Sequence, residues 1–584
     1  MLTTSALIGL VLGLASCSND PLPKAPPPAP ASALYLNGHI YTGVPDRPWA
    51  EAMVTVGGAI HFVGSNEDAQ RALTKPEQTH DLDGHFVMAG IVDAHTHPGM
   101  VAVLPEEEGT STTPMPAKPK QATMEWLRNY DNDHPFTLMV NEGVWDVAEF
   151  LPSGPHKQQL DEIFPLTPVI LYDNSGHSMW VNSATLTLLG IDKHTSDISK
   201  NISEFVRDEH GEPTGWIKEF ALMPSLQGLL LPAEKEIRNN LLQQLNFLAS
   251  KGVTTIWDAG NFDMDDPVYA QVATLDKAGL LPLRYEGSYH IWNPAQIDTA
   301  VYELLQLREK YTTNKLKFNT IKIHFDGVAE ILTAGMLEPY ETDAQNSGGI
   351  LFTKERLKAL MLELDQADIN LHMHVVGDRA TRTALDAWQL AIESKGKPLT
   401  IELSLSHLET VHPDDIKRFK DLGVHANFTP HWFGGLFGEA GKINLGNERA
   451  SRSQVVGHFI DSGANVTLSS DVVSGDEAYR ANPFIGIEMS ITRQEFGSAI
   501  DAKTFSPANA AISIEEALQA YTINGARQLG YEERIGTLQA GKLADFIVLN
   551  TNPLETSPKA IHKISPTATV VEGQLVFGSH YSSK

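Results

Sequence analysis

The sequence contains a single cysteine, Cys17, in 584 residues. With no second thiol in the chain, no internal disulfide can form. The remaining composition is ordinary for a globular protein, with 42% hydrophobic and 20% charged residues. Because a single hydrophobic core stops growing at about 250–300 residues, a chain of this length is expected to form two or more structural units.

Positive charge is also scarce. Lys and Arg number 44 against 72 Asp and Glu, which gives a formal net charge of -28. Nucleic acid is therefore not an expected partner, because phosphate binding requires a basic face. The surplus of acid is typical of a soluble surface. It does not identify a small-molecule substrate, which meets only the local pocket.

The N-terminal region lacks an apolar run long enough to span a bilayer, which needs about 20 residues. The run from Ala6 to Ala15 has instead the length of the apolar core of a signal peptide, although residues 1–5 carry no Lys or Arg. The sequence Leu14-Ala15-Ser16-Cys17 resembles the lipobox of bacterial lipoproteins. A disordered tail with an incidental cysteine is the alternative.

The lipobox resemblance implies that residues 1–16 are a signal peptide and that Cys17 is acylated to become the mature N-terminus. Residues 17–33 are rich in Pro and Ala, which predicts an extended, lipid-anchored tether rather than a packed element. Ser18 stands where lipoproteins of the inner membrane carry an aspartate. We therefore expect a secreted lipoprotein anchored in the outer membrane and facing the periplasm.

Both ends of the remaining chain have short alternating runs interrupted by glycine, which is the pattern of β-hairpins. Residues 34–85 and 531–580 share this pattern and are predicted to form one small β-sandwich. Between them, residues 86–530 contain eight apolar strand candidates that alternate with helical stretches. This alternation predicts the α/β class and a (β/α)8 TIM-like barrel, with a doubly wound sheet as the competing arrangement.

One segment of the barrel region does not follow the alternation. Residues 99–250 lie between the first and second strand candidates and contain several Pro and Gly breaks. We interpret them as an insertion after strand 1, at the C-terminal rim of the barrel. Insertions at this rim lie over the active site.

The motif Asp93-Ala94-His95-Thr96-His97 ends the first strand candidate. Residues two apart in a strand face the same side, so His95 and His97 point together. Two neighbouring imidazoles suit a divalent transition metal such as zinc. Other polar residues also end strand candidates, where barrel enzymes place catalytic groups. They are His372, His374, His407, Glu409 and Asp471.

Lys322 lies within an apolar run, Ile321-Lys322-Ile323-His324-Phe325-Asp326-Gly327. Alternation places Lys322, His324 and Asp326 on one face. A buried, unpaired lysine is costly, so the side chain either extends to the surface or is carboxylated by carbon dioxide to become an anionic oxygen ligand.

A larger set of motifs extends over nearly the whole mature chain. They are Gly90 to His97, Gly176-His177-Ser178, Gly252 to Thr255, Lys322 with Asp326-Gly327, His374 to Ala380, His407-Leu408-Glu409, Ser470-Asp471 and Gly541 to Asp545. With these motifs the chain resembles the amidohydrolase superfamily, in the branch that includes N-substituted formamide deformylases. The likeness is specific for the branch and not for a substrate.

The resemblance implies a role for each matching residue. His95 and His97 would bind a first metal, and His374 and His407 would bind a second or complete the first site. Lys322 would be the carboxylated bridge, and Asp471 would bind metal and shuttle the proton. One or two divalent ions, zinc by expectation, follow from this set. His372 is the less favoured of its pair.

Three further residues stand out by their surroundings. His177, in the insertion, is expected to contact the substrate. Asp326 is expected to orient a ligand. Glu219 is a rim carboxylate without a predicted role.

The leading hypothesis is hydrolysis of a carbon–nitrogen bond other than a peptide bond, in an amide, formamide or cyclic amide, by metal-activated water. Deamination of an amidine-like ring carbon requires the same chemistry and is the competing hypothesis among metal enzymes. Two different classes of function also fit a barrel, namely a non-catalytic, surface-anchored binding lipoprotein and a metal-free enzyme such as an isomerase. The sequence leaves open whether the protein forms a homo-oligomer.

We predict that Cys17→Ser gives soluble protein without a lipid, because no other thiol can be acylated. Metabolic labelling with a radioactive fatty acid, followed by fractionation of membranes, measures this. Continued labelling of the variant would end the anchor hypothesis.

Overall fold

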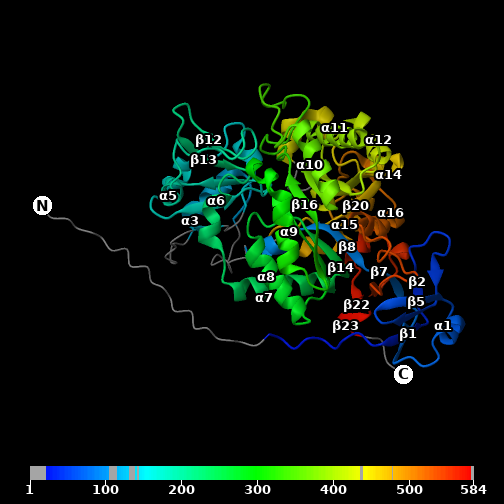
Figure 1. The fold of residues 1–584 in the computed structure, drawn as a ribbon. Coiled ribbons are helices and arrows are strands. Elements are labelled where there is room, and N and C mark those ends of the chain that lie inside the picture. The colour runs from blue at the N-terminus through cyan, green and yellow to red at the C-terminus, as the bar shows by residue number, and fades with distance from the viewer. Residues whose placement is uncertain are drawn as a thin grey trace.

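The computed structural model describes residues 22–103, 115–130, 139–140, 144–433, 439–475 and 478–579. The predicted signal peptide and Cys17 lie outside these residues. Figure 1 shows a central barrel, with the inserted segment to the left and a two-sheet sandwich at the lower right. Within the described ranges, no helix has the length and apolar character needed to cross a membrane.

Eight parallel strands form the central sheet, in the order β20-β19-β18-β17-β16-β15-β14-β8. They are β8 (Ile91–Thr96), β14 (Val253–Asp258), β15 (Arg284–Ile291), β16 (Leu316–His324), β17 (Asn370–Val375), β18 (Leu403–His407), β19 (His425–Phe428) and β20 (Asn465–Leu468). Each of the eight strand candidates contributes one of these strands. The α/β class and the barrel are therefore confirmed, and the doubly wound sheet is excluded.

The barrel closes between β8 and β20 without a ladder of paired strands. At the C-terminal rim, the backbone N–H of Asp471 donates to the carbonyl of His95 at 2.9 Å. Below the rim, α17 (Ile523–Gln528) contacts both edge strands. Its Gln528 donates to the carbonyl of Ala94, and Asn524 donates to the carbonyl of Val466. The helix thus satisfies backbone groups that an open seam would leave unpaired.

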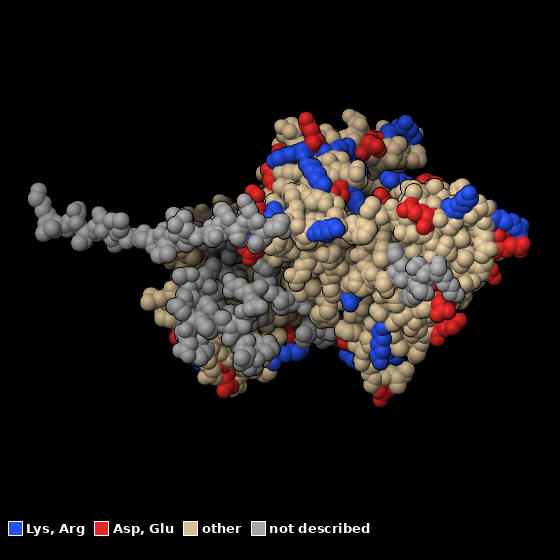
Figure 2. Space-filling model, turned by 90° about the horizontal axis from the view of Figure 1, so that it is seen from below, with Lys and Arg blue, Asp and Glu red and all other residues tan. Residues whose placement is uncertain are grey.

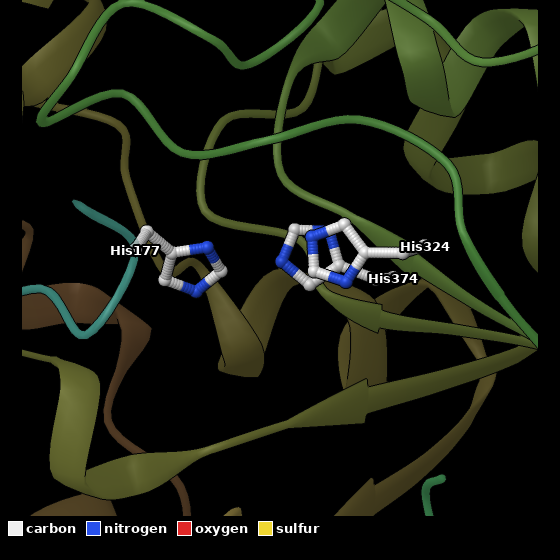
Figure 3. Close-up of side chains that lie close together, drawn as sticks. All are labelled: His177, His324 and His374. Atoms are coloured by element: carbon white, nitrogen blue, oxygen red, sulfur yellow. The ribbon is translucent and has the colours of Figure 1, made fainter. Parts of the chain in front are cut away.

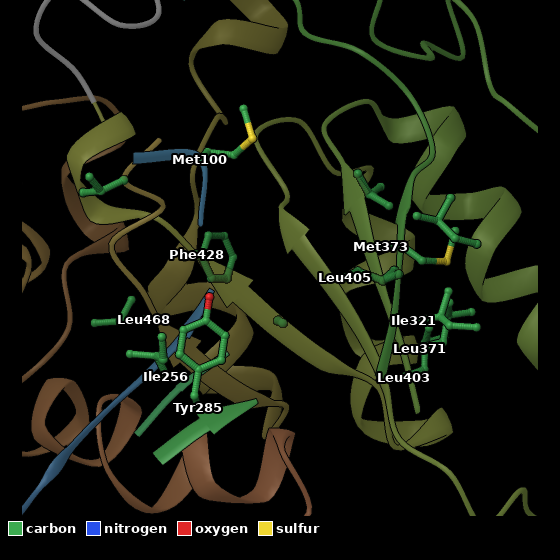
Figure 4. Close-up of a cluster of buried hydrophobic side chains, with 14 of the residues drawn as sticks. Met100, Ile256, Tyr285, Ile321, Leu371, Met373, Leu403, Leu405, Phe428 and Leu468 are labelled. Carbon is green, nitrogen blue, oxygen red and sulfur yellow. The ribbon is translucent and has the colours of Figure 1, made fainter. Parts of the chain in front are cut away.

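The barrel strands are buried on both faces, and the two faces differ in chemistry. Ile321, Leu371 and Met373 belong to the apolar core, part of which is drawn in Figure 4. Lys322 and His372 alternate with them and are buried as well. Because successive residues of a strand face opposite sides, apolar packing on one face brings the polar side chains of the other face together.

Helices follow the strands around the barrel. They are α7 (Glu234–Ser250), α8 (Asp265–Lys277), α9 (Ala300–Tyr311), α10 (Lys354–Ala367), α11 (Asp378–Lys395), α12 (Pro413–Leu422), α13 (Glu439–Ala450), α14 (Val456–Ser462), α15 (Pro483–Thr492) and α16 (Ile514–Ala520), with 3-10 turns at η2 (Pro294–Asp298), η3 (Pro430–Trp432), η4 (Ala478–Ala481) and η5 (Ala508–Ala510). Apolar residues of α7, Ile237, Leu241 and Leu245, lie in the main core. This helix, at the end of the segment interpreted as an insertion, therefore packs as a barrel helix.

The inserted segment has a five-stranded sheet of its own, in the order β12-β13-β11-β10-β9. Its strands are β9 (Met139–Val140), β10 (Val169–Tyr172), β11 (Ser178–Val181), β12 (Phe205–Arg207) and β13 (Pro213–Lys218); α2 (Pro98–Val103), α3 (Lys120–Asn129), η1 (Val147–Phe150), α4 (Lys157–Asp161), α5 (Ser183–Leu188) and α6 (Met223–Leu230) complete it. Trp145, Trp180 and Trp216 share an apolar cluster with Val328 and Val376, which follow barrel strands. The insertion is thereby packed onto the rim.

The sandwich combines both ends of the chain, as predicted. One sheet has the order β5-β4-β1-β6 and the other the order β23-β22-β21-β7-β2-β3. The elements are β1 (Ser32–Leu36), β2 (His39–Tyr41), β3 (Trp49–Ala50), β4 (Ala52–Val56), β5 (Ala59–Gly64), α1 (Asn66–Ala72), β6 (Gln78–Asp81), β7 (Phe86–Ala89), β21 (Phe546–Leu549), η6 (Pro553–Glu555), η7 (Pro558–Lys563), β22 (Pro566–Val571) and β23 (Gln574–Gly578). Apolar residues of both sheets, such as Tyr35, Val87 and Phe546, form one core.

Two expectations about the first 100 residues differ from the structure. Residues 86–530 are predicted to form the barrel, but Phe86–Ala89 pairs with β2 and β21 of the sandwich, and the first barrel strand begins only after Gly90. The described part of the Pro-rich segment does not hang free. Ala25 packs against the main core, and Pro27 accepts a hydrogen bond from Gln574. Its exposed carbonyls allow such docking where a neighbouring side chain offers a donor.

Charge of both signs is distributed over the surface seen in Figure 2. Lys and Arg side chains stand among Asp and Glu side chains on that face, without a continuous patch of one sign. Charge on this face therefore does not single out a binding region.

Candidate metal centre

Two groups of metal-ligating side chains lie at the C-terminal rim of the barrel. The first consists of His95, His97 and Asp471, and the second of His177, His324 and His374. Within each group the ligand atoms lie within 4.8 Å of one another. All are buried except His177, which is partly exposed. Imidazole and carboxylate donors at this spacing can hold a divalent transition metal.

The first group is assembled from the two edge strands of the barrel. Asp471 Oδ1 lies 3.2 Å from His95 Nε2 and 3.5 Å from His97 Nε2. Lys322 Nζ, on β16, lies 3.2 Å from His95 Nε2. His407 Nδ1, at the end of β18, lies 3.5 Å from Asp471 Oδ2. The two edge strands are also joined directly, since the side chain of Asp93 accepts the backbone N–H of Ser470, 377 positions away in sequence.

Burial sets the protonation of this group. It lowers the pKa of His95 and of His407 well below the usual value, so both imidazoles are neutral near pH 7 and offer lone pairs. Burial also lowers the pKa of Lys322 to about 7. Burial alone would raise the pKa of Asp471, but His407, His97 and Lys322 lower it to about 2. His95 and His407 therefore present neutral nitrogen atoms beside one ionised carboxylate.

Left-handed backbone directs two of these side chains into the site. By alternation His407 would lie on the same face as Leu403 and Leu405, which are packed in the main core. Its φ of 74° departs from the strand, and its ring meets Asp471 instead. Asp471 itself has a φ of 50°. Such conformations cost energy and persist where the surrounding structure holds them.

The second group combines the barrel with the insertion (Figure 3). His324 and His374, on neighbouring strands, are stacked with ring centroids 3.8 Å apart, and His177 faces both at 5.6 Å. Glu219 Oε2 lies 2.6 Å from His177 Nδ1 and 3.7 Å from His324 Nε2. Burial acts to lower the pKa of His177, but Glu219 raises it above the usual value.

His374 connects the two groups. Its ring centroid is 4.4 Å from that of His407, which itself contacts the first group. His372, two residues earlier, lies behind the site, with Nε2 3.0 Å from His95 Nδ1 and its ring stacked on Trp257. It is placed to orient His95 rather than to bind a metal.

Two residues have larger roles in the structure than the sequence indicates. His324 is not among the predicted ligands, although its alternation with Lys322 is the signal that could have identified it. Glu219, a rim carboxylate without a predicted role, is buried and engaged by His177 and by the hydroxyl of Thr333. Both residues therefore belong to the site.

Asp326 has a structural task at the rim. Its carboxylate accepts the backbone N–H groups of Gly335, Val376 and Gly377. These hydrogen bonds hold in place the loop that directly follows β17, the strand on which His374 lies.

Several buried nitrogen atoms of the site lack hydrogen-bond partners among the described residues. These are Nε2 of His324, both ring nitrogens of His374 and Nδ1 of His407. Native structures rarely bury polar atoms unpaired. Lone pairs of neutral imidazoles that converge without donors are what a bound cation would satisfy, so the residues fit a metal.

Comparisons with known proteins identify the family of this chain. Residues 78–577 match the amidohydrolase family. The chain belongs to that family. Its relatives include the N-substituted formamide deformylase of Arthrobacter pascens, 25% identical over 556 residues, which are 93% of this chain and 97% of the other. The exoenzymes regulatory protein AepA of Pectobacterium carotovorum is 27% identical over 448 residues, covering 76% and 94% of the two chains.

Solved structures show the same fold for this member of the amidohydrolase family. An uncharacterized metal-dependent hydrolase from Pyrococcus horikoshii superposes with a TM-score of 0.65. The likeness covers 90% of this chain and 99% of the other at 21% identity.

We predict that removal of divalent metal lowers the thermal unfolding temperature. A ligand that binds only the folded state stabilises it by about 2.7 kcal/mol at 100 times its Kd. Chelated protein is titrated with Zn²⁺, Mn²⁺ or Co²⁺ while the melting temperature and the bound metal are measured. His374→Ala should respond less than the wild type, and His61→Ala, an exposed imidazole, should respond as the wild type does. An equal response of His374→Ala would contradict the assignment.

Proposed function

We propose that the protein hydrolyses carbon–nitrogen bonds other than peptide bonds, in amides or formamides. The observation that carries this proposal is the convergence of neutral imidazoles, Lys322 and an ionised Asp471 at one rim of the barrel. Membership of the amidohydrolase family and the likeness to a formamide deformylase support it.

We propose that the metal is zinc. His95, His97, Lys322 and Asp471 would hold a first ion, and His374 with His407 and His324 a second. A bound ion supplies a water molecule of lowered pKa and polarises the scissile carbonyl group. Borderline-soft nitrogen donors and a carboxylate are the ligands that zinc prefers.

Asp471 is assigned the proton transfer. Its carboxylate stays ionised near neutral pH because its pKa is lowered to about 2. With Oδ1 toward His95 and His97, it accepts the proton of the attacking water and later returns it to the leaving nitrogen. The return is needed because an amide nitrogen leaves as a neutral amine.

His177 is assigned contact with the substrate. Glu219 engages its Nδ1 at 2.6 Å, which fixes the ring and leaves Nε2 to face the site. An N–H at that atom can donate to the oxygen of the scissile carbonyl as negative charge develops there. Where a second ion is bound by His374 and His324, His177 would instead be a further ligand to it, so the number of metals per chain separates the two roles.

We propose that Lys322 is carboxylated. Its side chain is 1% exposed, and burial lowers its pKa to about 7, so much of the amine is uncharged near neutral pH. The uncharged nitrogen adds to carbon dioxide, forming an N–C bond and releasing one proton. The resulting anionic oxygen atoms would lie beside His95, whose Nε2 is 3.2 Å from Nζ.

The carboxylation of Lys322 predicts a dependence on bicarbonate. Metal reconstitution in bicarbonate-free buffer should restore less activity than reconstitution with bicarbonate. The native mass of protein reconstituted with bicarbonate should exceed that of protein reconstituted without it by one carboxyl group per chain. Lys322→Ala should weaken metal retention by at least about 10-fold. Lys317→Ala, on the same strand with Nζ bonded to the carbonyl of Thr313, is the matched control. Equal reconstitution with and without bicarbonate would refute the modification.

For Asp471→Asn we expect retained fold and a loss of turnover of about 10²–10⁴-fold, the contribution of a general acid–base group. Asn is isosteric but cannot take up the proton. Release of formate or carboxylate from a panel of N-formyl and N-acyl amines measures turnover, and metal analysis confirms the ion is bound. Asp46→Asn, an exposed carboxylate of the sandwich region, is the control. Full activity of Asp471→Asn would exclude the shuttle role.

We further propose that the chain is a secreted lipoprotein, acylated at Cys17 and anchored to the outer membrane. The order of apolar run, lipobox and Pro-rich segment supports this. An anchored hydrolase of this kind meets small molecules in the periplasm.

A further inference from the structure

His290 is a buried histidine at the C-terminal rim of the barrel. It lies near the end of β15, the third barrel strand, and is 1% exposed. Neither of its ring nitrogens has a hydrogen-bond partner among the described residues. Because native structures rarely leave buried polar atoms unpaired, we expect this ring to meet a group that the unmodified side chains around it do not supply.

The register of the barrel sheet places His290 beside Lys322. The strands β15 and β16 are parallel neighbours, and His290 is aligned with Lys322 in their pairing. Neighbouring strands lie about 4.8 Å apart, and aligned residues point to the same face of the sheet. Tyr289 is aligned with Ile321, and both belong to the apolar core on the other face. His290 and Lys322 therefore share the polar interior of the barrel.

Close packing holds the ring of His290 at the metal centre. A Cβ atom at position 260 would lie 2.6 Å from Cβ, Cγ and Nδ1 of His290, so only glycine fits there. The carbonyl oxygen of the same Gly260 lies 3.2 Å from Nδ1 of His97. Phe262 packs edge-to-face on His290, with ring centroids 4.5 Å apart. Because Nδ1 lies against Gly260, Nε2 is at the end of the ring that extends away from this loop.

His290 is not placed as a ligand of either metal group. It belongs to neither of the two clusters whose ligand atoms lie within 4.8 Å of one another. Its ring centroid is 6.2 Å from that of His324. Burial lowers the pKa of His290 well below the usual value, and Lys322 and His97 lower it further. The neutral ring has one N–H donor, which suits an oxygen atom held beside it.

Carboxylation of Lys322 would supply such an oxygen atom. In the amine form, Nζ lies 3.2 Å from Nε2 of His95, and both nitrogens of His290 stay unpaired. When the amine adds to carbon dioxide, one N–C bond forms, one proton is released and the side chain ends in two anionic oxygen atoms. Hydrogen bonds to an ionised acceptor are about twice as strong as those between neutral groups.

We propose that His290 donates a hydrogen bond from its ring to the carboxyl group of carboxylated Lys322 and thereby stabilises the modification. This inference rests on the proposed function as far as the carboxylation of Lys322, and it does not depend on the substrate. His290 is a positioning residue, because it acts through Lys322. Its loss should weaken carboxylation directly and metal retention as a consequence.

The test measures carboxylation itself. Protein stripped of metal and bicarbonate is titrated with isotopically labelled bicarbonate at one saturating concentration of Zn²⁺, and native mass spectrometry counts the carboxyl groups and ions per chain. His290→Phe keeps an aromatic ring against Phe262 but removes both nitrogens. We expect it to require about 10–100-fold more bicarbonate for half carboxylation, since a hydrogen bond to a charged group is lost. His290→Gln retains a side-chain donor and should stay closer to the wild type.

Tyr289→Phe is the matched control, because Tyr289 precedes His290 on the same strand and lies in the apolar core on the other face. Its titration should equal that of the wild type. Lys322→Ala should take up no label, which assigns the carboxyl group to that side chain. The melting temperature of each metal-free variant shows that it is folded.

The outcomes separate this inference from the proposed function. Equal titrations of the wild type and His290→Phe, or equal weakening in His290→Phe and His290→Gln, would overturn the role of His290 while Lys322 remains carboxylated. A loss of kcat/KM in His290→Phe at unchanged carboxylation would assign the ring to the substrate and would also overturn it. A wild type that takes up no label would remove both the modification and this inference, whereas amide hydrolysis by that protein would still support the proposed function.

Discussion

The hydrogen bond from the backbone N–H of Asp471 to the carbonyl of His95 joins the last barrel strand to the first. The rest of the site depends on this closure, because it fixes the carboxylate against the two histidines of β8. The seam is held by this loop at the rim and by α17 below it. A shift of one residue along the seam would carry Asp471 away from both imidazoles. Barrel closure and ligand geometry are therefore one structural constraint.

Strained backbone also gathers at this rim. His407 and Asp471 have left-handed backbone, and Glu219 of the insertion has a φ of 49°. Regular strands would send alternate side chains to opposite faces, and only a departure from the strand brings His407 to Asp471. The insertion adds His177 and Glu219 to the same rim. Its apolar cluster, which includes residues that follow barrel strands, packs that addition against the site.

Much of this architecture could be predicted from local pattern. Periodicity locates all eight barrel strands, and the HxH motif, Lys322, His374, His407 and Asp471 come together at one rim. The features that the sequence does not predict share a cause, because they depend on contacts between residues far apart in the chain. Phe86–Ala89 joins the sandwich although it reads on into β8, and Glu219 is buried by an interaction with a histidine 42 residues away. Alternation along the strand already places His324 on the same face as Lys322. Its stacking on His374, however, depends on the register of β16 and β17.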